Sequence, residues 1–401
     1  MSGVIIIGAG QASGQAAASL RQAGYEGSIT IFGEEDQVPY QRPPLSKAYL
    51  SGEVNKDRVL VRPEKFYAEK EISLHTNTRV NAVDPARKKV ITQDGEKYTY
   101  HKLLIATGSR PRILNIQGSD MEGIHYLRTI ADVDAIRSRM ESVKHVCIVG
   151  GGYIGLEVAA VAKKMGLEVT VLEMEERILK RVTTPEMSGF YHELHASRGV
   201  NIRTGTLVSG FEGKARVSSV VCGDEKIPAQ LVIVGIGIVP NVELAKAAGL
   251  QCDNGIIVDN HCRTSDPDIY AAGDCTNHPN PILDRRLRLE SVPNAMEQAR
   301  VASTNMLGGD KVYAAVPWFW SDQYELKLQM VGFSADGDTS IVRGNKSSNE
   351  FAVFYLKEGK IVAVDAVNSP KEFMICKQLY GKKVNSENLA NLEFELKSLL
   401  T

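Results

Sequence analysis

The chain has 401 residues, of which 43% are hydrophobic and 24% are charged, and its formal net charge is −1. This length predicts two or three domains, and the composition is that of a globular protein with a sizeable core. The near-zero charge argues against a nucleic-acid partner or an anionic membrane surface, and no apolar run approaches the roughly 18–20 residues that would span a bilayer.

A glycine-rich turn opens the chain, between a predicted strand and a predicted helix. The apolar run Val4–Ile7 precedes the turn Gly8–Gly14, and an alanine-rich segment follows it. Glycines permit a tight turn and a close approach of the backbone to a pyrophosphate, whose charge is attracted by the free N–H groups of the helix N-terminus. The next apolar run leads to Glu34, near the spacing of roughly 20 residues expected for an acid that holds a ribose. The sequence therefore predicts a dinucleotide-binding unit here.

The segment after this unit predicts shorter elements. Residues Pro39–Phe66 are rich in Pro, Arg and Lys, and Leu74–Ile91 is typical of short strands with a turn at Asp84. The run Lys102–Gly108 then predicts a buried strand that ends in Ala-Thr-Gly. We expect this strand to close the first sheet near its cofactor.

A second unit of the same kind lies near the middle of the chain. The apolar run His145–Val149 precedes the turn Gly150–Gly155, and the following strand ends in Glu173, again near the spacing of roughly 20 residues. An acid there accepts hydrogen bonds from a ribose 2′-hydroxyl and repels a 2′-phosphate, so the sequence favours NADH over NADPH, although the basic Arg177 lies close by. Two such units predict two dinucleotides, with electrons passing from one to the other.

The rest of the chain predicts a return to the first unit and then a different kind of domain. Strands and a helix are predicted at Ile256–Asp259, Asp268–Cys275 and Val292–Asn305, and a mixed sheet with a helix at Leu326–Val331, Thr339–Val342, Phe351–Leu356, Ile361–Val367 and Lys371–Leu379. The predicted fold class is α/β, with two Rossmann-like dinucleotide-binding domains and a smaller α+β C-terminal domain. The predicted boundaries are 1–112 and 240–316 for the discontinuous first domain, 113–239 for the second, and 317–401 for the third.

The cysteines and histidines predict no metal site and no redox pair. The six cysteines include no Cys-x-x-Cys pair, and none lies near the first glycine-rich turn. This argues against a disulfide relay, so the first cofactor itself is expected to face the electron acceptor. It also suits a reducing, cytoplasmic setting. The residues His192, His195 and His278 lack metal-ligand spacing and are interpreted as surface or loop residues.

Together these motifs resemble those of the NADH-dependent ferredoxin reductases that feed cytochrome P450s and Rieske-type dioxygenases. This is the putidaredoxin reductase and biphenyl dioxygenase ferredoxin reductase group of the glutathione-reductase-like flavoproteins. The motifs shared with the whole superfamily are the two glycine-rich turns, Ala106–Gly108 and Ala271–Asp274. The more specific ones are Pro39–Lys47, Glu290–Ala295 and Pro317–Tyr324. The resemblance covers essentially the whole chain.

The resemblance implies FAD in the first domain, NADH in the second and a C-terminal domain beside the flavin. The implied activity is that of an FAD-dependent NADH:ferredoxin oxidoreductase, which takes hydride from NADH onto flavin N5 and passes single electrons to a [2Fe-2S] ferredoxin serving a cytochrome P450 or a Rieske-type oxygenase. One alternative is a rubredoxin reductase or an NADH oxidase-like flavoprotein, although an oxidase usually needs a redox-active cysteine. A second is an interaction flavoprotein like apoptosis-inducing factor, which would call for a targeting segment or long insertions.

The resemblance also implies a residue set for each cofactor. For FAD the set is Gly8, Gly10, Ala12, Ser13, Glu34, Arg42, Lys47, Val80, Ala106, Thr107, Gly108, Gly273, Asp274, Val292 and Trp320. For NADH it is Gly150, Gly152, Tyr153, Ile154, Gly155, Glu157, Glu173, Gly235, Ile236 and Gly237.

Three of these residues are implied to be catalytic: Lys47, Glu157 and Trp320. In the family, a Glu at this position reaches toward the Lys near flavin N5, whereas the alternative for Glu157 is an exposed acid that interacts with the helix dipole. Trp320 is expected in a linker to the last domain, bordering the flavin, and its alternative is ordinary core packing.

A local basic cluster predicts where the ferredoxin docks. Arg285, Arg286 and Arg288 lie in a predicted loop just before the segment expected to touch the flavin, and ferredoxins of this type are usually acidic. The alternative is a solvated charge run that is paired with Asp284 and Glu290.

Overall fold

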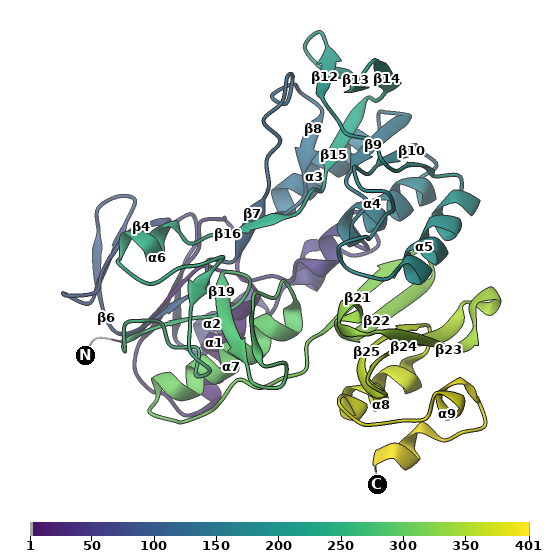
Figure 1. Cartoon of the computed structure of the whole chain (residues 1–401). Helices are drawn as coiled ribbons and strands as arrows, with labels where there is room; N and C mark the ends of the chain where they lie inside the picture. Colours follow the sequence, from purple (N-terminus) through teal and green to yellow (C-terminus); the bar gives the residue numbers. More distant parts are fainter. Residues whose placement is uncertain (1–2, 401) are drawn as a thin grey trace. The chain divides into compact units, whose positions relative to one another are not determined.

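The computed structural model describes residues 3–400, which divide into two compact units (Figure 1). Unit 1 contains the chain up to Arg42 together with Asn55–Arg110 and Ile238–Pro317. Unit 2 contains Pro43–Val54, Pro111–Gly237 and the chain from Trp318 onwards. The division into three domains stays a prediction.

Unit 1 is built on a seven-stranded sheet with the order β3-β2-β1-β6-β5-β4, in which β18 also pairs with β6. Its strands are β1 (Gly3–Ile7), β2 (Ile29–Phe32), β3 (Ile72–His75), β4 (Val80–Asp84), β5 (Lys89–Thr92), β6 (Lys97–Ile105) and β18 (Ile269–Ala271). The pairs around β1, β2 and β18 are parallel, and β4 and β5 extend the sheet in antiparallel fashion. A parallel strand that is covered on both faces has a continuous apolar sequence, and β1 could be predicted for this reason.

The two faces of β1 belong to different cores. Val4 and Ile6 pack with the helices α1 (Gln11–Gln22) and α7 (Val292–Met306), whereas Ile5 and Ile7 pack with the cluster on the other face. The remaining elements of unit 1 are η2 (Lys56–Val59), α2 (Glu64–Glu69), β7 (Ser109–Pro111), β16 (Ile238–Pro240), α6 (Glu243–Ala247), β17 (Ile256–Ile257), β19 (Thr276–Asn280) and β20 (Arg285–Leu287). Small alanines along α1 let α7 approach it closely, so two helices distant in sequence form one layer.

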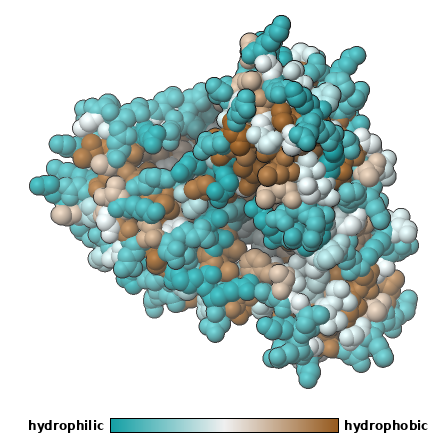
Figure 2. All heavy atoms as spheres, turned by 45° about the horizontal axis from the view of Figure 1, so that its top comes forward, coloured by the Kyte–Doolittle hydropathy of each residue, from teal (hydrophilic) through white to brown (hydrophobic). Residues whose placement is uncertain are grey.

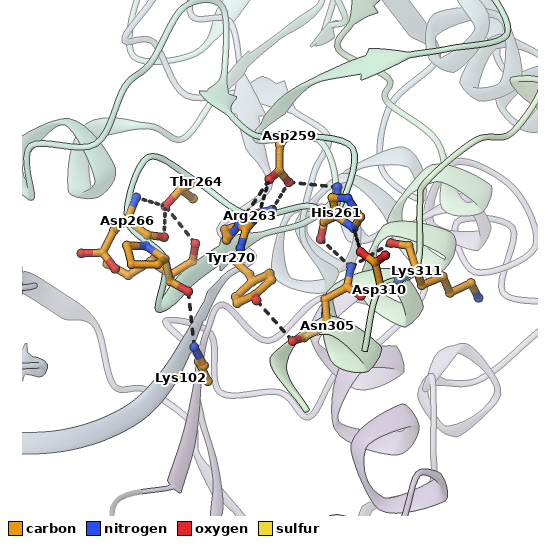
Figure 3. Close-up of polar contacts among 12 residues, drawn as sticks. Lys102, Asp259, His261, Arg263, Thr264, Asp266, Tyr270, Asn305, Asp310 and Lys311 are labelled. Atoms are coloured by element: carbon orange, nitrogen blue, oxygen red, sulfur yellow. Dashed lines mark hydrogen bonds and ion pairs between the residues drawn. The ribbon is translucent and has the colours of Figure 1, made fainter. Parts of the chain in front are cut away.

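A polar network holds the segment that leads into β18 (Figure 3). Asp259 accepts hydrogen bonds from the backbone N–H groups of His261 and Arg263, both at 2.9 Å. The Tyr270 hydroxyl donates to the carbonyl of Asn305 in α7, and the Asn305 amide donates to the carbonyl of His261. The network fixes β18 against α7 and thereby the Gly-Asp turn that follows β18.

Unit 2 contains a parallel five-stranded sheet with the order β11-β10-β9-β15-β8. Its strands are β8 (Ile124–Tyr126), β9 (His145–Val149), β10 (Glu168–Leu172), β11 (Asn201–Arg203) and β15 (Leu231–Val234), and its helices are α3 (Ile130–Met140), α4 (Tyr153–Lys164) and α5 (Pro185–Ser197). A three-stranded antiparallel sheet of β12 (Gly210–Gly213), β13 (Val217–Cys222) and β14 (Glu225–Pro228) and the short helix η1 (Pro43–Ser46) complete this part.

The C-terminal part of unit 2 is an antiparallel sheet with the order β21-β22-β25-β24-β23. Its strands are β21 (Trp318–Gln323), β22 (Leu326–Gly332), β23 (Thr339–Asn345), β24 (Glu350–Lys357) and β25 (Lys360–Val367). The helices are η3 (Ser334–Asp336), η4 (Lys346–Ser348), α8 (Pro370–Leu379), α9 (Ser386–Ala390) and η5 (Leu396–Leu400). The predicted strands and helix of this region are confirmed, but the sheet is antiparallel rather than mixed.

Three expectations from the sequence are wrong at the level of local structure. Trp320 lies in strand β21 rather than in a linker, and Arg285 lies in strand β20 rather than in a loop. His195 and His278 are completely buried rather than surface residues. Tertiary pairing decides the outcome: β21 pairs with β22, β20 pairs with β19, which contains His278, and the buried His195 is hydrogen bonded.

Polar and charged residues cover most of the face seen in Figure 2, with apolar patches between them. Among residues 3–400, no helix combines the length and the apolar character needed to cross a bilayer.

Candidate functional site

The first glycine-rich turn in unit 1 is shaped as a cradle. Gly8 has a φ of +104°, and a Cβ atom there would lie 2.2 Å from the carbonyl oxygen of Ala106, so no other residue fits. Gly10 is the N-cap of α1 and offers no side-chain cap, and the space in front of it is open. The Ser13 hydroxyl is buried without a hydrogen-bond partner in the described chain. Free N–H groups and an unsatisfied hydroxyl at an open helix end fit the pyrophosphate of a dinucleotide.

Residues from distant segments converge on this cradle. Gly273 packs beside Ala12, since an added Cβ would lie 3.6 Å from the Ala12 Cβ. The Ser109 hydroxyl donates to Asp274 at 2.8 Å and so orients its carboxylate. Thr107 is fixed by a reciprocal pair of hydrogen bonds with Asn241, at 2.8 and 2.9 Å. The structure therefore brings the predicted Ala106–Gly108 and Gly273–Asp274 segments together at the N-terminus of α1.

Gln298 belongs to this cradle, although no sequence pattern indicated it. It lies on α7, the helix whose first residue is the predicted Val292, and is completely buried. Its Oε1 accepts hydrogen bonds from the backbone N–H of Gly273 at 2.8 Å and from the Thr276 hydroxyl at 2.9 Å. Its Nε2 is buried without a partner in the described chain. A glutamine in a helix is common, so only the fold identifies it as the support of the Gly-Asp turn.

The acids after β2 have different surroundings. Glu34, the predicted ribose ligand, is exposed and lies 3.4 Å from Arg79. Its neighbour Glu35 accepts hydrogen bonds from Arg42 at 2.8 Å and from the Tyr40 hydroxyl at 2.5 Å. Arg42 is therefore held in place by Glu35, while the Glu34 carboxylate is accessible to a ligand. Val80 is buried in β4.

The second glycine-rich turn, in unit 2, repeats the geometry of the first. Gly150 has a φ of +111°, and a Cβ there would lie 2.4 Å from the carbonyl oxygen of Gly235. A Cβ on Gly155 would lie 2.2 Å from the carbonyl oxygen of Gly150. Gly152 is the N-cap of α4, with no side-chain cap and with open space in front of it. Since the chain here approaches itself as closely as in unit 1, the same class of ligand fits.

Glu173 is held at the edge of this second cradle. Its two carboxylate oxygens accept hydrogen bonds from the backbone N–H groups of Gly151 at 2.7 Å and Glu175 at 2.9 Å. Arg181 lies close to Gly237, its guanidinium 3.9 Å from where a Cβ would be. The predicted acid and both predicted glycine loops, including the half-buried Ile236, therefore line one site.

Lys47 and Glu157 form the contact that the resemblance implied. Lys47 follows η1, and its Nζ lies 2.6 Å from Glu157 Oε2. Two further donors bind this carboxylate: the Ser46 hydroxyl at 2.5 Å and the Ser321 hydroxyl at 2.6 Å. Burial raises the pKa of Glu157, and Lys47 with the two hydroxyls opposes that increase. With 1% of its side chain exposed, Glu157 is not an exposed acid of the first helical turn.

The aromatic residues beside this cluster belong to the same unit. The Tyr153 ring lies 5.5 Å from Phe319, and its hydroxyl contacts the Met330 sulfur. Trp318 is half-buried and packs against Phe373 of α8, with Lys377 4.1 Å from its ring. Trp320 stays half-buried. Lys47 and Trp320, which the resemblance assigned to FAD, thus lie in unit 2 together with the residues assigned to NADH, among them the exposed Ile154.

Comparison with known proteins gives consistent matches over the whole chain. Residues 2–299 match the family described as pyridine nucleotide-disulphide oxidoreductase, and residues 318–400 match the family described as reductase C-terminal. Putidaredoxin reductase of Pseudomonas putida is 46% identical over 96% of this chain and 93% of its own length.

Solved structures are similar along their full length as well. The ferredoxin reductase for the CYP199A2 system from Rhodopseudomonas palustris has a TM-score of 0.97 and 40% identity, with complete coverage of both chains. The reductase of a covalent putidaredoxin reductase–putidaredoxin complex has a TM-score of 0.96 and 44% identity, covering 100% of this chain and 98% of its own.

Proposed function

Because the chain belongs to the pyridine nucleotide-disulphide oxidoreductase family, we propose that it is an NADH-dependent ferredoxin reductase that serves a cytochrome P450 or a Rieske-type oxygenase. Members of this family use FAD and NAD(P)H. The main support for the proposal is that the cradle occurs twice. Each cradle has an uncapped helix N-terminus, at Gly10 or Gly152. Each also has a preceding glycine, Gly8 or Gly150, that no other residue can replace.

The residues of the two cradles would hold FAD in unit 1 and NADH in unit 2. When bound, FAD accepts two electrons as hydride from NADH and releases them singly. The N-terminus of α1 binds the pyrophosphate, Glu34 accepts from the adenosine ribose, and Asp274, oriented by Ser109, accepts from a ribityl hydroxyl. Val292 at the start of α7 offers backbone N–H groups. Lys47 supplies a positive charge whose position is fixed by Glu157.

Coenzyme choice is proposed to depend on Glu173. Its carboxylate is fixed by two backbone N–H groups at the mouth of the second cradle, where it can still accept from a ribose 2′-hydroxyl. A 2′-phosphate in the same place would meet a fixed negative charge. NADH is therefore preferred over NADPH.

The function is tested by stopped-flow mixing of the FAD-loaded protein with NADH and then with a [2Fe-2S] ferredoxin or a rubredoxin. We expect rapid bleaching of the flavin by NADH, slower bleaching by NADPH, and catalytic turnover with the ferredoxin. Turnover with rubredoxin alone would overturn the acceptor assignment. Absence of bleaching by either nucleotide would overturn the reductase assignment. We also propose a cytoplasmic location for the protein.

Ferredoxin docking is proposed at the arginines of β20. Arg285 and Arg286 are exposed, and the Arg286 guanidinium is held rigid by the carbonyls of Val258 and Asn277. Arg288 is largely covered and ion-paired with Glu290 at 2.6 Å, so it contributes less to an outward field. An ordered positive patch favours association with an acidic partner.

Charge reversal at this patch tests the docking site. Arg285→Glu should lower ferredoxin-dependent turnover several-fold at low salt and less at high salt, because screening shortens the field to ~10 Å at 0.1 M. Ferricyanide reduction should stay near normal. Arg87→Glu, an equal charge change in the β4–β5 turn, is the matched control. Equal losses in both variants would place docking elsewhere.

A further inference from the structure

A line of buried polar side chains leads away from Glu157 into unit 2. Ser321 donates to Glu157 Oε1 at 2.6 Å, and Gln323 Nε2 lies 3.2 Å from the Ser321 oxygen. Gln323 Oε1 lies 2.8 Å from Nε2 of His195, whose Nδ1 lies 3.2 Å from the Tyr324 hydroxyl. Ser321, Gln323 and His195 are each at most 1% exposed. Nothing in the glycine cradles or in the sheet pairing requires these polar groups to be there.

Every donor in this line points toward Glu157. An amide carbonyl can only accept, so His195 carries its proton on Nε2 and donates to Gln323. Its Nδ1 then accepts from the Tyr324 hydroxyl. The Gln323 amide donates to Ser321, whose own proton is left for the Glu157 carboxylate. Because hydrogen bonds in a low-dielectric interior polarise one another, the line favours the ionised form of its last acceptor.

We infer that His195 and Gln323 are positioning residues, which orient the Ser321 hydroxyl toward Glu157 and so keep that carboxylate ionised as the partner of Lys47. The orientation of Ser321 and the ionisation of Glu157 do not depend on the proposed function. Only their effect on catalysis rests on it. Without the line, Ser321 is free to turn, and Glu157 loses a charge-assisted hydrogen bond while remaining buried.

The surroundings allow His195 to act as a neutral donor. Burial lowers the pKa of His195 to about 4, so the ring is uncharged at neutral pH. The titratable and charged groups that face the line are Lys47, Tyr153 and Tyr191 around Glu157, Asp322 beside Tyr191, and His192, Arg198 and Glu325 around the outer end. Among residues 3–400, Lys47 is the one cation in contact with Glu157, so loss of the Ser321 bond is not compensated by another charge.

The first test uses ¹⁵N-histidine spectra of the protein and needs no turnover. One histidine, identified by its loss in His195→Gln, should show the Nε2–H tautomer at neutral pH. In Gln323→Leu this signal should shift toward a mixture of tautomers. An Nδ1–H tautomer in the wild type, or no response to Gln323→Leu, would overturn the inference whatever the enzyme does with NADH.

The second test follows the pH dependence of flavin reduction by NADH in single turnover. Gln323→Leu and His195→Phe should raise the apparent pKa that limits the rate at low pH by about one unit, the expected effect of losing one hydrogen bond to a charged group. His195→Gln, which keeps an amide donor near the Nε2 position, should restore the profile, and His192→Gln on the same helix is the control. Profiles that superimpose for all variants would overturn the inference while leaving the reductase function intact. Circular dichroism verifies that each variant folds. If His195→Phe does not fold, the pH profile of Gln323→Leu alone tests the inference.

Discussion

Asp365 is a buried acid that the proposed reaction does not use. It lies in β25, is 4% exposed, and accepts hydrogen bonds from the Thr183 and Tyr355 hydroxyls, both at 2.9 Å. Burial raises the pKa of Asp365 from 3.8 to about 6, and the two hydroxyls oppose this only in part. We predict that this acid makes the C-terminal sheet less stable as the pH rises.

The sign and size follow from proton linkage. Between the unfolded pKa of 3.8 and the folded pKa of about 6, the folded protein binds more protons than the unfolded chain. Stability from Asp365 is therefore gained as the pH falls through the folded pKa and lost as it rises. From about pH 7.5 to about pH 5 the gain in unfolding free energy is about 1.4 kcal/mol, or one factor of ten in the folded population.

The perturbation that isolates this group is Asp365→Asn, which keeps an acceptor for both hydroxyls and removes the charge. Urea unfolding of the FAD-loaded protein can be followed by tryptophan fluorescence, because both tryptophans lie in β21 of the same sheet. The unfolding free energy of the variant minus that of the wild type should fall by about 1.4 kcal/mol from about pH 7.5 to about pH 5.

A matched control is Asp224→Asn, which removes an exposed carboxylate in the turn between β13 and β14. Its stability relative to the wild type should be the same at both pH values. The reasoning is refuted if the Asp365→Asn difference is also independent of pH, since the folded and unfolded pKa values would then be equal.

Two further predictions concern the cradles. Gly8→Ala should abolish FAD retention during purification, measured by flavin absorbance per protein, because the new Cβ would meet the Ala106 carbonyl. Gly24→Ala, also at positive φ but in open space, should retain FAD; equal loss in both would show that backbone strain rather than the cradle is responsible. Glu173→Ala should raise KM for NADH about tenfold and narrow the gap to NADPH in kcat/KM, and unchanged ratios would contradict its role.

Much of the fold was predictable because its signals are local. Continuous apolar runs mark the buried parallel strands, and the glycines of the two turns are required by positive φ and close approach at Gly8 and Gly150. Both requirements act within a few residues of the chain, or against the neighbouring strand of the same unit. The family match and both cofactors follow from the same residues.

The supports of the site were not predictable from local patterns. Gln298 lies on a helix that was predicted correctly, but its contact with Gly273 depends on how α7 packs. The charged run around Arg285 conceals strand β20, whose hydrogen bonds come from β19. Charge and periodicity say nothing about such partners, which lie on other elements of the fold.

Strand β21 shows why the residues that support the functional site could not be predicted from the sequence. Its sequence places aromatic residues first and polar residues last, and polar side chains such as Ser321 and Gln323 usually face solvent. The structure buries both, because Glu157 on α4 and His195 on α5 supply the hydrogen bonds that burial would otherwise forfeit. A strand with polar residues on its buried face is costly unless every group is paired, and the pairing here ends at the carboxylate that fixes Lys47. The departure from the hydrophobic pattern is therefore itself evidence that this face of β21 is constrained by the site rather than by the core.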